Sequence, residues 1–153
     1  MKIPRTHGFT LIELVTVIAV MSILLSIALP AFREMVASQK VKSTASTLQT
    51  SLLLTRSEAL KRNTNVTLAP TTTGNPWNGG WSVQLTDGTV LSTYSPVTAV
   101  NITGGPTSVV FQNTGRVVSG IGAIFKVSST DTTAIRCVML SLTGMPAVTT
   151  SGC

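Results

Sequence analysis

The chain is 153 residues long, 43% of them hydrophobic but only 5% aromatic, and its formal net charge is +6. Beyond residue 62 three basic residues face two acidic ones, so this part is almost neutral, which excludes a general nucleic-acid-binding surface on it. The same part has no histidine and only two cysteines, which excludes a Ser–His–acid or Cys–His catalytic set and a zinc site, so we expect a protein that is not an enzyme and uses no metal or cofactor.

The first element is an apolar run over residues 9–29, which follows the basic residues Lys2 and Arg5. At about 1.5 Å per residue, a helix of this length reaches about 30 Å, which is the thickness of the hydrocarbon core of a bilayer. Positive charge ahead of the run predicts that the N-terminus stays in the cytoplasm and that the remainder is exported. We therefore expect a single-pass transmembrane helix over residues 9–29.

Two simpler interpretations of this run remain open. Ser26 and Ala28 loosely match the cleavage site of an ordinary secretory signal, although the run is longer than the apolar part of such a signal. A plain membrane anchor explains the length equally well. Neither explains Glu13, because an acid inside lipid costs about 2.5–3.5 kcal/mol and normally marks a partner.

The stretch GFTLIELVTVIAVMSILLSIALPAF, residues 8–32, resembles the class III signal and first helix of type IV pilins and pseudopilins. This resemblance implies that residues 1–8 are a leader, that prepilin peptidase cleaves after Gly8, and that Phe9 becomes the N-methylated mature N-terminus. It also implies that Glu13 pairs with the amine of Phe9 on a neighbouring subunit and thereby sets the register of a filament.

The same resemblance implies where the protein acts and with what. The implied partners are other pilin or pseudopilin subunits, prepilin peptidase and the membrane. The implied location is the bacterial inner membrane, with the head in the periplasm, and then a filament or filament tip after assembly.

Residues 30–62 show the pattern of an amphipathic helix, with apolar residues at spacings of three to five. Because no Gly or Pro interrupts residues 31–62, we expect one continuous helix from about Phe9 to Arg62. Pro30 removes one helical hydrogen bond and predicts a kink at this point. The apolar stripe expected to lie on a sheet consists of Phe32, Val36, Val41, Ala45, Leu48, Leu52, Thr55 and Ala59.

The remaining residues, 63–153, predict a β-rich globular head. Short runs rich in β-branched residues are separated by turn signals such as Asp87–Gly88. The pattern favours an α+β fold, in which an antiparallel sheet wraps on the long N-terminal helix. Trp77 and Trp81 flank a Gly-rich loop and are expected to pack inside the head. The expected strands cover residues 65–69, 80–85, 89–94, 108–112, 122–127 and 134–142.

Both cysteines, Cys137 and Cys153, lie near the end of the sequence. In an exported domain, an even number of cysteines predicts one disulfide, in which Cys153 would hold a segment that otherwise frays. Two unrelated thiols remain the alternative.

Four segments of the head add a narrower resemblance. The segments RSEALKRNTNVTL, WNGGWSV, FQNTGRV and IRCVMLSLTG are similar to the GspH/FimT branch of pseudopilins and minor pilins. The implied function is that of a minor pilin, a structural subunit that joins or initiates a type IV pilus filament. The alternative is a GspH-like pseudopilin of a type II secretion system. The cysteine able to hold the tail favours the pilus slightly.

Some members of this branch take part in DNA uptake through a Gly-Arg-x-Arg motif near the C-terminus. The matching residues here are Gly144, Met145, Pro146 and Ala147, so both arginines are missing. Arg116 and Arg136 remain as candidates for a weak DNA contact. Two isolated cations give little affinity for phosphate, so the sequence disfavours nucleic acid as a partner.

Overall fold

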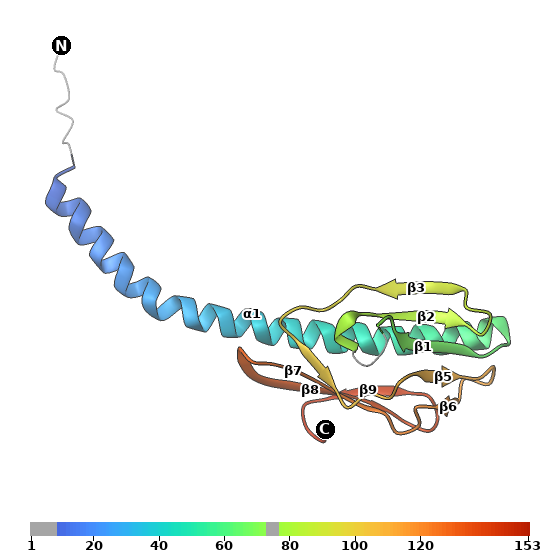
Figure 1. Ribbon diagram of the computed structural model, residues 1–153. Helices are drawn as coiled ribbons and strands as arrows, with labels where there is room; N and C mark the ends of the chain where they lie inside the picture. The colour runs from blue at the N-terminus through green and yellow to red at the C-terminus, as the bar shows by residue number, and fades with distance from the viewer. Residues whose placement is uncertain (1–8, 73–76) are drawn as a thin grey trace, which may run out of the picture.

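The computed structural model describes residues 9–72 and 77–153, and one long helix dominates it. This helix, α1, runs without interruption from Leu11 to Arg62. It ends where the sequence predicts, because Asn63 takes the left-handed conformation with φ of 52° and donates its backbone N–H to the carbonyl of Ala59. Figure 1 shows that the C-terminal half of α1 is flanked by strands, while the N-terminal half extends away from them.

Nine strands and one short 3₁₀ helix follow α1 in the described residues. They are β1 (Val66–Pro70), η1 (Trp77–Gly79), β2 (Trp81–Leu85), β3 (Val90–Tyr94), β4 (Asn101–Thr103), β5 (Val109–Phe111), β6 (Val117–Ser119), β7 (Ile124–Ser129), β8 (Thr132–Leu140) and β9 (Pro146–Thr149).

The strands form two antiparallel sheets rather than one. The first sheet has the order β3-β2-β1-β5-β6, and the second has the order β4-β7-β8-β9. The α+β class and the packing of the helix on antiparallel strands are confirmed. The division into two sheets was not predicted, because β1 pairs with β5 across an intervening stretch of about forty residues, and no local pattern specifies that partner.

The core lies between α1 and the inner faces of the two sheets. Val41, Leu48 and Leu52 of the helix are completely buried there, and they pack in one cluster with side chains from both sheets. The sheet side chains of this cluster include Leu68, Trp81, Val83, Phe111, Phe125 and Val138. Burial of such side chains is worth about 1.5–3 kcal/mol each, so this cluster is a large favourable term in the folding of the head.

The predicted apolar stripe of α1 is only partly correct. Its members from Val41 to Ala59 are buried as expected. Phe32 and Val36, however, are 61% and 38% exposed, because α1 at this level is not yet enclosed by the sheets. These two side chains therefore do not belong to the core of the head.

Candidate functional site

The N-terminal end of α1 is organised around Thr10 and Glu13. Thr10 is the N-cap residue, and its Oγ1 accepts a hydrogen bond from the backbone N–H of Glu13 at 3.3 Å. In return, Oε2 of Glu13 accepts from the backbone N–H of Thr10 at 3.0 Å and from its hydroxyl at 2.9 Å. This reciprocal arrangement is a capping box, and it satisfies donors that the first turn of a helix otherwise leaves unpaired.

Thr10 was missed by the sequence analysis, although a signal for it exists. Thr10-Leu11-Ile12-Glu13 has the T-x-x-E spacing that marks a capping box immediately ahead of an apolar run. The structure thus gives Glu13 a partner on its own chain before any other subunit is considered. The carboxylate is held at the positive end of the helix dipole, where a negative charge is stabilised.

The apolar half of α1 is unprotected by the rest of the chain. Its large side chains are all exposed, from 48% at Val17 to 79% at Leu11. By length and composition, α1 is apolar enough to cross a membrane. Such a surface requires lipid or other apolar helices around it. Phe9 immediately precedes the N-cap and is also exposed, whereas Gly8 and the rest of the expected leader lie outside the described residues.

Pro30 lies inside α1, and the helix continues through it. Figure 1 shows that α1 curves between its exposed half and the half that lies in the head. A kink caused by Pro30 remains a prediction. The hydroxyl groups of Ser22 and Ser26 donate to the carbonyls of Ile18 and Ile23, so neither compensates for the hydrogen bond that Pro30 removes.

The two tryptophans pack inside the head, and Trp81 connects the first sheet to the helix. Both are buried, as expected, and Trp81 Nε1 donates to the hydroxyl of the buried Ser51 on α1 at 3.0 Å. Trp77 Nε1 donates to the carbonyl of Pro106 at 2.9 Å, and its ring meets that of Phe125 edge to face. Both indole N–H groups are therefore used for internal packing.

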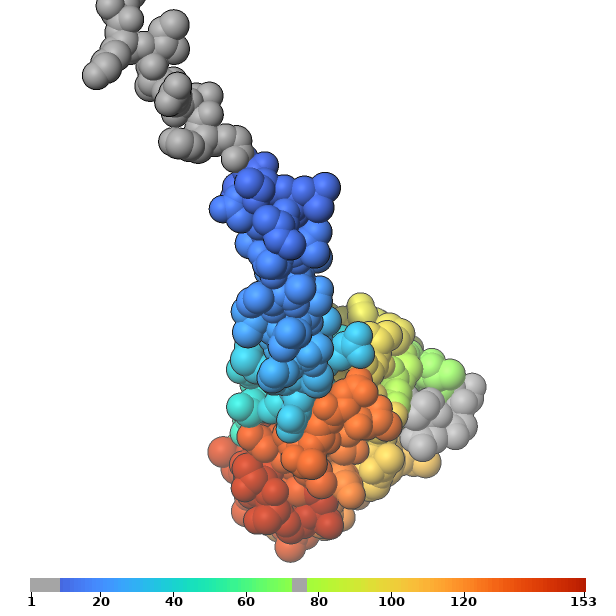
Figure 2. Space-filling view, turned by 90° about the vertical axis from the view of Figure 1, so that its left-hand side faces the viewer, coloured from blue at the N-terminus to red at the C-terminus, as the bar shows by residue number. Residues whose placement is uncertain are grey.

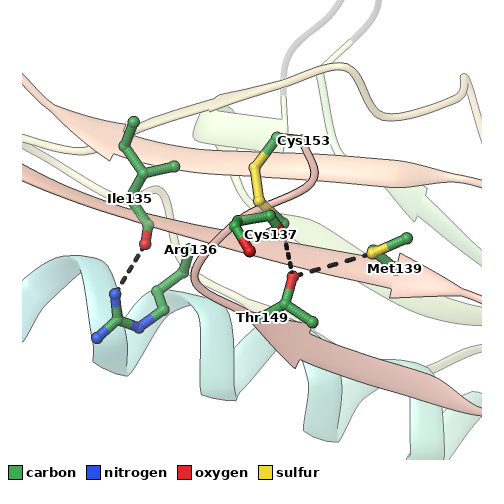
Figure 3. Close-up of a disulfide and its surroundings, with 7 residues drawn as sticks. Ile135, Arg136, Cys137, Met139, Thr149 and Cys153 are labelled. Atoms are coloured by element: carbon green, nitrogen blue, oxygen red, sulfur yellow. Dashed lines mark hydrogen bonds between the residues drawn. A yellow bond between two sulfur atoms is a disulfide. The ribbon is translucent and has the colours of Figure 1, made fainter.

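A disulfide joins Cys137 and Cys153, whose Cα atoms are 5.4 Å apart, which confirms the predicted pairing. Cys137 is buried in β8, and Figure 3 shows the segment after β9 turning back over this strand to reach it. The hydroxyl of Thr149 donates to the carbonyl of Ser151 at 2.7 Å, which supports the same turn. The bond thus fixes the segment after β9 to the centre of the second sheet.

Arg56 joins two turns at the end of the head remote from Pro30. Its Nε donates to the carbonyl of Gly115 at 3.0 Å, and its Nη1 contacts the sulfur of Met145. A side chain at Gly144 would collide with the carbonyl of Gly115, so these two turns approach each other backbone to backbone. Arg56 therefore has a structural role that the sequence analysis missed, because its partners are remote in sequence.

The structure does not bring the two candidate DNA contacts together. Arg116 is exposed and precedes β6 in the first sheet. Arg136 lies in β8 of the second sheet, is half-buried, and donates to the carbonyl of Ile135 at 2.7 Å. Two cations on different sheets do not form a phosphate-binding track.

In residues 9–72 and 77–153, no cluster of three His, Cys, Asp or Glu side chains is placed to hold a metal ion. The ion pair found in these residues joins Glu58 and Arg62 on α1 at 2.6 Å. The hydrogen bond from Arg62 lowers the pKa of Glu58 below its ordinary value of 4.5. This pair supports the last turns of the helix.

Comparison with known proteins gives two family matches. A family model described as type II transport protein GspH matches residues 44–144. A second model, the prokaryotic N-terminal methylation motif, matches residues 3–29. No curated protein matches the chain.

Two crystal structures of the type IV minor pilin FimU from Pseudomonas aeruginosa have a similar fold. The first has a TM-score of 0.59 and 21% identity, and the match covers 71% of this chain and 91% of the FimU chain. The second, from another crystal form, has a TM-score of 0.58 and 18% identity, with coverage of 74% and 90%. At 18–21% identity, the similarity to FimU shows a shared fold.

Proposed function

The chain belongs to the GspH family of type II transport proteins and carries the prokaryotic N-terminal methylation motif, and from this premise we propose that it is a minor pilin that joins or initiates a type IV pilus filament. The members of this family are pilins and pseudopilins, which are structural subunits and not enzymes, as expected from the sequence. Membership also implies processing by prepilin peptidase and assembly with other pilins.

The observation that carries the proposal is the position of the capped Glu13 at the start of an apolar helix half that the head leaves exposed. A helix that served only as an anchor would gain nothing from a carboxylate at this depth, because the charge is costly there. A carboxylate held near the new N-terminus by Thr10 is instead ready to meet a cation from another subunit.

The methylation motif and the placement of Glu13 support the following proposed sequence of events. The precursor spans the inner membrane with its leader in the cytoplasm and its head in the periplasm. Prepilin peptidase cleaves after Gly8 and methylates the amine of Phe9. As the subunit enters a filament, the carboxylate of Glu13 pairs with the Phe9 amine of a neighbour, while the apolar helix halves pack against each other.

The oxidising periplasm allows the Cys137–Cys153 disulfide in either machine. A C-terminal cysteine that holds the tail resembles the FimT/FimU type of minor pilin, and this favours the pilus slightly. The alternative is a GspH-like pseudopilin that acts in protein secretion, and the experiment must distinguish it from a minor pilin of a type IV pilus.

The experiment is an in-frame deletion of the gene in its own host, complemented with the wild-type gene or with Gly8→Ala. Surface pili and secreted type II substrates are measured in parallel. We expect the deletion to lose pili and to keep secretion, and we expect Gly8→Ala to accumulate uncleaved precursor and to restore nothing. Loss of secretion with normal pili would assign the protein to the secretion system instead.

A further inference from the structure

A groove of about 210 Å³ lies beside α1 just after the apolar half ends. Phe32, Arg33, Val36 and Lys40 of the helix line one side of it, and Ala99 and Asp131 close the other. Figure 2 shows the light-blue part of α1 meeting a yellow and an orange segment of the head at this level.

The groove lies at the depth of lipid headgroups if residues 9–29 span the hydrocarbon core. Phe32 is three residues beyond Leu29, or about 5 Å along the helix. The headgroup layer adds about 5–7 Å on each side of the core, so Phe32 and Arg33 fall within it. Lys40 is eleven residues beyond Leu29, or about 16 Å along the helix, so its Cα lies past this layer. Side chains on a helix lean toward its N-terminus, so the ammonium group of Lys40 lies closer to the headgroups than its Cα does.

The side chains of the groove combine apolar and cationic character. Phe32 and Val36 are the members of the helix stripe that the head leaves exposed, and they continue the apolar surface of the first half. Arg33 and Lys40 form no salt bridge within residues 9–72 and 77–153. Asp131 is the acid that lines the groove, so the two cations outnumber it. Glu34 faces a separate groove on the side of Thr132 and Thr133.

We propose that this groove binds an anionic phospholipid of the periplasmic leaflet. The phosphate lies between Arg33 and Lys40, and the first part of an acyl chain lies against Phe32 and Val36. Cationic side chains at a bilayer surface attract anionic lipids, and apolar side chains beside them contact the acyl region. The proposal rests on the membrane-anchored state that the proposed function requires, and it adds a specific lipid contact that orients the head before assembly.

The test uses the full-length protein carrying Phe32→Trp, reconstituted into phosphatidylcholine vesicles. Brominated acyl chains quench tryptophan fluorescence on contact, and they are supplied either on phosphatidylglycerol or on phosphatidylcholine at the same mole fraction. The wild-type protein gives the background, because Trp77 and Trp81 are buried inside the head. We expect stronger quenching by brominated phosphatidylglycerol, with a local enrichment of about fivefold for each cationic side chain at the surface.

Two charge variants in the Phe32→Trp background identify the cause. Arg33→Gln with Lys40→Gln should abolish the preference for phosphatidylglycerol. Lys42→Gln with Lys61→Gln removes the same amount of charge from exposed positions outside the groove. This variant should keep the preference for phosphatidylglycerol. Equal quenching by the two lipids before any charge is removed would overturn the proposal. Quenching that disappears as the protein-to-lipid ratio rises would assign the groove to a subunit contact instead.

Leu24→Trp separates this proposal from the proposed function. Strong quenching of Leu24→Trp with none at Phe32→Trp would place the apolar run in the bilayer and the groove outside it, which overturns the lipid site alone. Absence of quenching at both positions would contradict the membrane anchor itself, and with it both proposals.

Discussion

Glu13 accepts two hydrogen bonds from Thr10, one from its backbone N–H at 3.0 Å and one from its hydroxyl at 2.9 Å. The side chain that we propose for filament assembly is therefore already bonded within its own first helical turn. This arrangement reduces the cost of holding a carboxylate near lipid, because both the acid and the orphan donors of the helix end find partners. If Glu13 pairs with Phe9 of a neighbour as proposed, that contact replaces or supplements one that exists in the single subunit.

Thr10→Val removes the hydroxyl of the capping box and keeps the size of the side chain. Loss of an N-cap costs about 0.5–2 kcal/mol of helix stability, so the first turn of α1 should fray. Hydrogen exchange of the amides of Glu13 and Leu14, which donate to Thr10, should be faster in bilayers by about 2- to 30-fold. Thr10→Ser keeps the hydroxyl and should exchange as the wild type does; unchanged exchange in Thr10→Val would contradict a working capping box.

Ser51→Ala should destabilise the head through Trp81. The indole N–H of Trp81 donates to this buried hydroxyl, and without it a buried donor stays unpaired, which costs about 1–3 kcal/mol. Ser57 is the matched control, because it also donates to a carbonyl three residues back but is exposed and accepts nothing from Trp81. Chemical unfolding followed by tryptophan fluorescence measures both variants, and an equal effect of Ser57→Ala would contradict this role of Ser51.

The disulfide should contribute measurably to the stability of the head. Cys137 and Cys153 are 16 residues apart, and a loop of this size is worth about 3 kcal/mol in the chain-entropy model. We expect the double variant Cys137→Ser with Cys153→Ser to have a free energy of unfolding about 3 kcal/mol lower, and hence a lower denaturation midpoint. The reduced wild type should behave like the double variant. Identical unfolding of the oxidised and reduced wild type would mean that the two thiols act independently.

The Glu58–Arg62 pair should make a small, pH-dependent contribution to stability. The hydrogen bond from Arg62 lowers the pKa of Glu58, so folding favours the ionised carboxylate. The contribution is therefore complete above the pKa of the unfolded chain and is lost as the pH falls through the lower pKa of the folded chain. Because Arg62 is 42% exposed, we expect only about 0.3–0.5 kcal/mol.

The measurement is the difference in unfolding free energy between the wild type and Glu58→Gln. This difference should be present at about pH 6 and should shrink as the pH falls below the ordinary pKa of a glutamate, about 4.5. A difference that grows on acidification would contradict the sign of the pKa shift.

Much of the fold follows from local sequence patterns. The helix from Leu11 to Arg62 was predicted because no Gly or Pro breaks its second half, and the six predicted strands all appear. Each of these strands carries several β-branched or aromatic residues, and such a pattern predicts a strand from a short window of sequence.

The strands that were missed depend on distant partners. β4 and β6 have three residues each, and β9 begins with Pro146, a residue that normally argues against a strand. Pairing with β7, β5 and β8 holds them in place, and Pro146 is tolerated because β9 is an edge strand. Such pairing is a property of the assembled sheets and leaves little trace in a short window of sequence.

The residues of the candidate site also divide into those that local sequence patterns predict and those that depend on distant partners. The cysteine pair was predicted from an even number of cysteines and is confirmed. Glu13 was singled out as an acid inside an apolar run and through the resemblance to pilins, and its role in assembly stays a prediction. Arg56 was missed because its partners, Gly115 and Met145, lie in turns 59 and 89 residues further along. Thr10 was detectable from T-x-x-E and was missed because the acid was interpreted only through a partner on another subunit.

The most direct test of the central claim is the amount of Glu13→Ala protein that enters filaments. The variant is expressed in the deletion strain, and sheared filaments and inner membranes are compared for mature protein, with Glu34→Ala as a control that removes a charge outside the apolar run. We predict normal cleavage after Gly8 but a filament content at least about tenfold lower, because an unpaired N-terminal amine costs more than 1.4 kcal/mol in an apolar filament core. Glu13→Ala protein found in filaments at the wild-type level would contradict the pairing of Glu13 with Phe9.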